Sequence, residues 1–156
     1  MNAGATLEQV VREVRPPAHL AGRPYLQAVY DEPEYAVRNL WRLYGGWYDG
    51  EPAHLQPAPT AEIGREVASL AGGVAGLVTR ALAVASEGRL ALASHLIDWA
   101  IAAAPEDGGA HAARAQIYAR RASVARALMT RGIFSAAAQE SAAKSPPLSP
   151  QGRGQG

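Results

Sequence analysis

Residues 60–131 carry a long helical pattern whose breaks contain glycine or proline, and this feature most constrains the fold. The breaks fall at residues 72–73, 87–88 and 105–109. No stretch alternates apolar and polar residues for long enough to indicate a sheet. Much of the 48% apolar content is alanine, which favours closely packed helices. We therefore predict an all-α fold.

Two more helices are expected in the N-terminal half. Thr6 and Gln9 are spaced as a capping box, which predicts a helix over residues 7–15 that ends before two prolines. Asp31 is a candidate cap for a second helix, with Pro33 in its first turn and its end at residues 45–46. An Asp-Gly turn is expected at residues 47–50, followed by a proline-rich, extended segment to residue 59.

The later helices show a hint of a repeated helix pair. Small and large residues alternate in tetratricopeptide-like spacing at Leu77, Ala81, Gly88, Ala93, Ile97, Ala100 and Pro105. This pattern favours helical hairpins in an antiparallel, tetratricopeptide-like array, although a generic hairpin would show much the same spacing. The first arrangement leaves open a peptide- or protein-binding module with a groove between helices at 74–86 and 90–104. We expect one helical domain over residues 1–141 and a disordered Ser/Pro/Gly-rich tail over 142–156.

Composition argues against several classes of partner. The formal net charge of +1 gives no electrostatic case for nucleic acid or for an anionic lipid surface. Cysteine is absent, which rules out disulfides and thiolate metal sites. Charged residues interrupt the first 17 residues, and glycines and an arginine interrupt the longest apolar stretch. We expect neither a signal peptide nor a membrane span, and hence a cytoplasmic location.

No residue pattern indicates a catalytic, cofactor or metal site within the chain. No two of its four histidines have metal-ligand spacing, and no serine or glycine-rich run matches a nucleophile elbow or a phosphate loop. His95 and Asp98 share a predicted helix face, where a surface or packing contact is the more common role. We expect no catalytic residue, no cofactor and no metal, although another chain could complete a metal site.

Aromatic residues gather in the N-terminal half, where residues 25–48 hold seven of the ten. We expect Tyr35 and Trp41 to belong to the core. Two aromatics on a glycine-rich turn are hard to bury together, so Tyr44, Trp47 and Tyr48 are candidate interface anchors. A polar rim for that surface could come from three α-helical neighbours: Arg38, Asn39 and Arg42. A solvated helix face is an equally good interpretation of those three.

Residues 35–55 read Tyr-Ala-Val-Arg-Asn-Leu-Trp-Arg-Leu-Tyr-Gly-Gly-Trp-Tyr-Asp-Gly-Glu-Pro-Ala-His-Leu. This run resembles the dimerisation domain of metallo-β-lactamase-type alkyl sulfatases, and the similarity extends over about residues 1–141. The resemblance implies a helical domain that holds two subunits together and lies against a zinc-binding domain that hydrolyses alkyl sulfate esters. Glu51 stands where Asn is common in that family.

The chain departs from the full-length pattern of that family in two further ways. It has no His-x-His-x-Asp-His motif and too few residues for the catalytic fold. The expected function is therefore a non-catalytic dimerisation or docking module. Its expected partner is a second copy or a separate metallo-β-lactamase-like domain, and zinc is expected only in that absent domain.

Overall fold

The computed structural model describes residues 4–145, and within that range the chain forms eight α-helices and no strand. The prediction of an all-α fold is therefore confirmed. The chain divides into two compact units. Of the described residues, the N-terminal unit comprises 4–58 together with Ala122–Ile133, and the core unit comprises Pro59–Arg121 together with 134–145.

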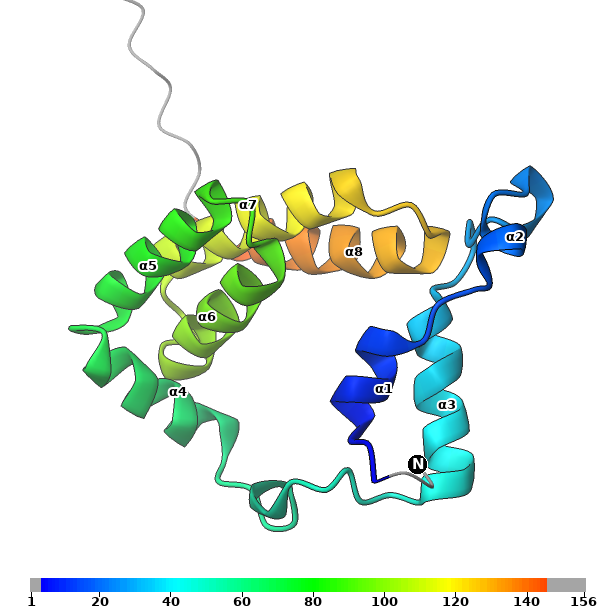
Figure 1. The fold of residues 1–156 in the computed structure, drawn as a ribbon. Helices are drawn as coiled ribbons and strands as arrows, with labels where there is room; N and C mark the ends of the chain where they lie inside the picture. Colours follow the sequence, from blue (N-terminus) through cyan, green and yellow to red (C-terminus); the bar gives the residue numbers. More distant parts are fainter. Residues whose placement is uncertain (1–3, 146–156) are drawn as a thin grey trace, which may run out of the picture. The chain divides into compact units, whose positions relative to one another are not determined.

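The N-terminal unit is built on helix α1 (Leu7–Glu13), which packs against helix α3 (Pro33–Gly45), as Figure 1 shows. A short helix α2 (Ala18–Ala21) and a 3-10 turn (Pro24–Leu26) lie between them in sequence. The predicted capping box of α1 is confirmed. The Thr6 backbone N–H donates to the Gln9 side-chain oxygen at 2.8 Å, and the Gln9 backbone N–H donates to the Thr6 hydroxyl at 3.2 Å. Helix α1 ends at Glu13, earlier than expected, because Val14 is already extended ahead of the two prolines.

Of three expectations for the segment around α3, the structure confirms one and differs from two. The helix ends at Gly45, as predicted, because Gly46 has a φ of 85°. The predicted cap Asp31 is wrong: Glu32 is the N-cap, and Asp31 instead accepts a hydrogen bond from the Glu32 backbone. The segment expected to be extended contains a 3-10 turn at Pro52–His54.

The core unit begins with three helices, α4 (Thr60–Leu70), α5 (Val74–Ser86) and α6 (Leu90–Ala103). Helices α7 (Gly108–Val124) and α8 (Leu128–Lys144) complete it, although the end of α7 and the start of α8 are grouped with the N-terminal unit. The predicted breaks at 72–73 and 87–88 are confirmed. The glycines there have φ values of 80°, 104° and 81°, which side chains with a Cβ rarely adopt.

Two helix boundaries differ from the sequence-based expectation. Helix α7 starts at Gly108, inside the break predicted for 105–109. A further break at residues 125–127 was not predicted, and helix α8 continues past residue 131 to Lys144. That helix runs beyond the expected domain boundary at 141, and residues 146–156 of the expected tail lie outside the described residues.

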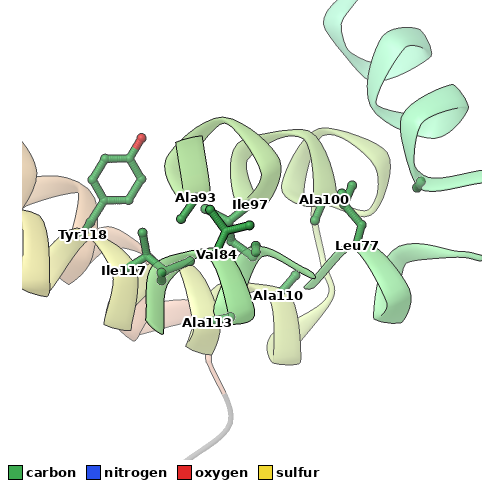
Figure 2. Packing of buried hydrophobic residues seen from close by; sticks show 12 residues of the cluster. Leu77, Val84, Ala93, Ile97, Ala100, Ala110, Ala113, Ile117 and Tyr118 are labelled. Atoms are coloured by element: carbon green, nitrogen blue, oxygen red, sulfur yellow. The ribbon is translucent and has the colours of Figure 1, made fainter. Parts of the chain in front are cut away.

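The core lies among α5, α6 and α7 (Figure 2). Leu77 and Val84 of α5, Ile97 of α6 and Ile117 of α7 are fully buried or nearly so. Small residues between them let the helices approach closely: Ala81, Ala85, Ala93, Ala100, Ala110 and Ala113. The facing surfaces of α5 and α6 are therefore filled with side chains. The tetratricopeptide-like order of the array stays a prediction.

A polar network joins α6, α7 and α8 at the edge of this core. Arg114 donates to Asp98 Oδ1 at 2.7 Å and to Ser141 Oγ at 2.8 Å. Tyr118 Oη donates to the other Asp98 carboxylate oxygen at 2.5 Å. The pKa of Tyr118 is raised, mainly because the side chain is buried and secondly because of this hydrogen bond. His111 lies within 2.8 Å of a backbone carbonyl oxygen. The network ties three helices together around a mostly buried guanidinium.

Within residues 4–145, no single helix combines the length and apolar character needed to cross a membrane. Helices α4 and α5 meet those criteria only when taken together, and they are bent by 84° at their break.

Candidate association surface

The aromatic turn, residues 44–48, begins in the last two residues of α3 and is widely exposed. Trp47 is 81% exposed and Tyr44 is 74% exposed, whereas Tyr48 is 38% exposed. The rings of Trp47 and Tyr48 lie 6.0 Å apart at 55°, so they support one another in a tilted pair. Gly46 and Gly50 have positive φ values on either side of this pair. The turn therefore presents two large rings to solvent.

Asp49 holds the segment that follows the aromatic turn. Its Oδ1 atom accepts the backbone N–H of Glu51 at 2.9 Å, and its Oδ2 atom lies 2.6 Å from Nδ1 of His54. The hydrogen bond with His54 lowers the pKa of Asp49, and the same bond raises the pKa of His54. Between the two pKa values the pair is an ion pair, which closes the turn across the 3-10 segment.

Two of the three predicted polar residues, Arg38 and Arg42, line a hollow of about 340 Å³ at the end of α3. Its remaining walls come from both apolar and polar residues: Leu7, Trp41, Gly46, Trp47 and Asp49. Asn39 is exposed and does not line this hollow. Among residues 4–145, the buried Nε1 atom of Trp41 has no hydrogen-bond partner. The hollow thus combines two cations with aromatic walls.

Tyr35 and Trp41, the residues expected in the core, are partly buried rather than fully buried. The Tyr35 hydroxyl lies 2.8 Å from Oγ1 of Thr130, and Thr130 also donates to a Glu32 carboxylate oxygen at 3.3 Å. Tyr25 is 73% exposed. Tyr35 and Trp41 are therefore partly buried, whereas Tyr25 lies largely in solvent.

Leu40 and Leu43 were not singled out in the sequence, yet both are largely exposed. Together with Tyr44 they form what we call the α3 stripe, with spacing i, i+3 and i+4, and Trp47 lies two residues beyond the end of the helix. Across residues 4–145, fifteen of the eighteen exposed large apolar side chains belong to the N-terminal unit. Exposed apolar surface is therefore concentrated in the unit that also carries the aromatic turn.

No group of three or more His, Asp or Glu residues within 4–145 is arranged to hold a metal ion. His95 lies beside Trp99, with ring centroids 6.3 Å apart. Asp98 bonds to Arg114 and Tyr118 instead, so it takes part in helix packing. The histidines lie in separate segments: His19, His54, His95 and His111.

Comparison with known proteins gives a family match for most of the chain. The model of the family described as alkyl sulfatase dimerisation matches residues 6–144. A linear primary-alkylsulfatase from Pseudomonas sp. is 42% identical over 74 residues, which cover 47% of this chain and 14% of that protein. An (R)-specific secondary-alkylsulfatase from Pseudomonas sp. is 31% identical over 116 residues, which cover 74% of this chain and 18% of that protein.

Solved structures agree with these sequence matches. The stereoselective inverting sec-alkylsulfatase from Pseudomonas sp. superposes on this chain with a TM-score of 0.86 at 27% identity. That superposition covers 94% of this chain and 23% of the sulfatase. The chain thus spans less than a quarter of the length of each of these relatives.

Proposed function

The chain belongs to the alkyl sulfatase dimerisation family, and from this premise we propose that it is a non-catalytic association module. The N-terminal unit carries the contact surface, and a second copy of the chain is the partner. One observation carries the proposal: exposed apolar residues are concentrated in the N-terminal unit and include the aromatic turn. Contiguous exposed apolar patches of this kind mark association sites in soluble proteins.

Tyr44, Trp47 and Tyr48 act as the anchors of the contact in this proposal. A buried Trp or Tyr removes on the order of 150–250 Å² from water, which is the largest contribution that single side chains make to an interface. Arg38, Asn39 and Arg42 supply polar contacts at the rim, where charged groups stay partly hydrated. A separate metallo-β-lactamase-like domain is the other partner that the family relationship suggests.

The peptide-binding alternative receives no comparable support. Its groove was expected between α5 and α6, whose facing side chains are packed into the core. Exposed apolar surface lies mainly in the other unit.

The test compares Trp47→Ala with Leu70→Ala by sedimentation velocity of the full chain. Both side chains are more than four-fifths exposed, but Leu70 lies on α4 in the core unit. We expect Trp47→Ala to cost about 2 kcal/mol of association, which weakens the dimer roughly 30-fold. We expect Leu70→Ala to leave it unchanged. Equal effects of the two substitutions would contradict the assignment of the surface.

The proposal also states that the chain itself holds no zinc and that zinc belongs to a catalytic domain outside this chain. Its support is the scatter of the histidines and the engagement of Asp49, Asp98 and His111 by protein partners. Elemental analysis of the chain after dialysis against zinc is the measurement. We expect substoichiometric metal, and one tightly held zinc per chain would overturn this part of the proposal.

A further inference from the structure

Helix α3 presents a face without charge along its whole length. The α3 stripe, Leu40, Leu43 and Tyr44, is continued toward the N-terminus of the helix by Ala36, which is exposed, and Pro33, which is half-buried. The charged residues of α3 are Glu34, Arg38 and Arg42, which repeat at i, i+4 and i+8 along another side of the helix. A partner could therefore cover the stripe without desolvating an ion.

The stripe also changes in size along the helix. Pro33 and Ala36 are small and lie near its N-terminus, whereas Tyr44 is large and lies at its C-terminus. Leu40 stands midway, four positions from both Ala36 and Tyr44. A helix that is small at one end and large at the other fits best against an antiparallel copy of itself.

From this graded stripe we infer that two copies of the chain pair α3 against α3 in antiparallel order, with the two-fold axis at Leu40. Positions of the helix that are equally distant from Leu40 then face each other, so Ala36 meets Tyr44 of the second copy. In an isologous interface each such contact occurs twice. A parallel, in-register pair would instead set Tyr44 against Tyr44 and leave a void between the two alanines.

This inference rests on the proposed function and deepens it by naming the register of the contact. The second copy is the occupant because the stripe is complementary to itself when one copy is reversed and carries no like charges to repel. The stripe also shares Tyr44 with the aromatic turn.

The absence of cysteine from the sequence makes the register directly measurable. In Leu40→Cys, two thiols lie at the axis and face each other, so oxidation by diamide, which takes up two electrons and two protons, forms an intermolecular disulfide. Leu70→Cys is the control, since Leu70 is 82% exposed but lies on α4. We expect a covalent dimer on a non-reducing gel for Leu40→Cys and a monomer for Leu70→Cys.

A size exchange tests the same register without cross-linking. Ala36→Tyr and Tyr44→Ala should each weaken self-association by at least about tenfold, because each breaks a small–large match twice. The combined variant restores the match in reverse and should regain at least part of the affinity. Circular dichroism checks that each variant keeps its helices.

The outcomes separate the inference from the proposed function. A chain that stays dimeric but shows no disulfide at Leu40→Cys, or strictly additive losses in the size exchange, overturns the α3 pairing and leaves the association module standing. A wild-type chain that is monomeric contradicts both.

Discussion

At the residue scale, Asp49 organises the segment beside the exposed aromatic rings. Its two carboxylate oxygens are used separately, one for the Glu51 backbone and one for His54. The Asp-Gly pair at residues 49–50 predicts a turn. The contact with His54 was not predictable, because it depends on the 3-10 turn at Pro52–His54 in a segment whose prolines indicate extended backbone. The proline content of the segment did not indicate this local geometry.

Removal of the carboxylate charge should lower the pKa of His54. In the wild type, the hydrogen bond to Asp49 favours the imidazolium and raises this pKa above its ordinary value of 6.5. In Asp49→Asn the side chain keeps its shape but loses its charge, so we expect the His54 pKa to fall back toward 6.5. NMR titration of the His54 ring protons measures the difference, and identical pKa values in the two proteins would contradict the ion pair.

The stabilising effect of this pair has a defined pH window. The raised pKa of His54 makes its contribution complete below pH 6.5 and lost as the pH rises through the folded-state value. The lowered pKa of Asp49 makes its contribution complete above pH 3.8 and lost as the pH falls through the folded-state value. Both contributions are therefore complete between pH 3.8 and pH 6.5, where the ion pair stabilises the turn most.

Leu40 and Leu43 show a second limit of residue-scale prediction. The helix α3 has apolar residues on more than one side, and a sequence pattern does not say which side faces the interior. Val37 is buried whereas Leu40 is 54% exposed, although both are aliphatic and lie three positions apart. By contrast, Trp47 was identified as an interface candidate because a large ring on a glycine-rich turn is hard to bury.

At the element scale, the sequence predicts a helix end where a glycine adopts a left-handed conformation. It does not predict an end that depends on hydrogen bonds to residues far away in the sequence. The breaks at 72–73 and 87–88 coincide with glycines in the left-handed region. The break at 125–127 contains neither glycine nor proline. The first two amides of α8 donate there to the carbonyl oxygens of Val29 and Tyr30, at 2.8 and 2.9 Å. Partners almost 100 residues away leave no trace in local sequence.

The crossing of α4 and α6 depends on Gly64. A Cβ atom at this position would lie 2.7 Å from the Trp99 carbonyl oxygen and 2.9 Å from the Ala103 nitrogen, both of which are backbone atoms that cannot easily move. We expect Gly64→Ala to destabilise the fold by about 1–3 kcal/mol, because overpacking outweighs the gain in helix propensity. Urea denaturation followed by circular dichroism measures this change.

Gly132→Ala provides the matched control within another helix. Nothing lies within 4 Å of a Cβ at Gly132, so the substitution should stabilise α8 by up to about 1 kcal/mol. Loss of stability in both variants would contradict the assignment of the effect to the close crossing at Gly64.

At the scale of the whole molecule, burial is divided unequally between the units. Among residues 4–145, twelve of the sixteen buried apolar residues belong to the core unit, whereas most exposed ones belong to the N-terminal unit. Sequence composition predicts the helices of both units but not this division, because burial depends on which helices pack together. A unit with so small a core of its own gains most from a partner that covers it.

The most direct test of the account is the mass of the wild-type chain in solution, measured by light scattering over a range of concentrations. One chain has a mass of 16.3 kDa. We predict a mass that rises with concentration and levels off at twice this value, since a single isologous surface closes after two copies. A mass that stays at one chain at every concentration would contradict self-association through the N-terminal unit.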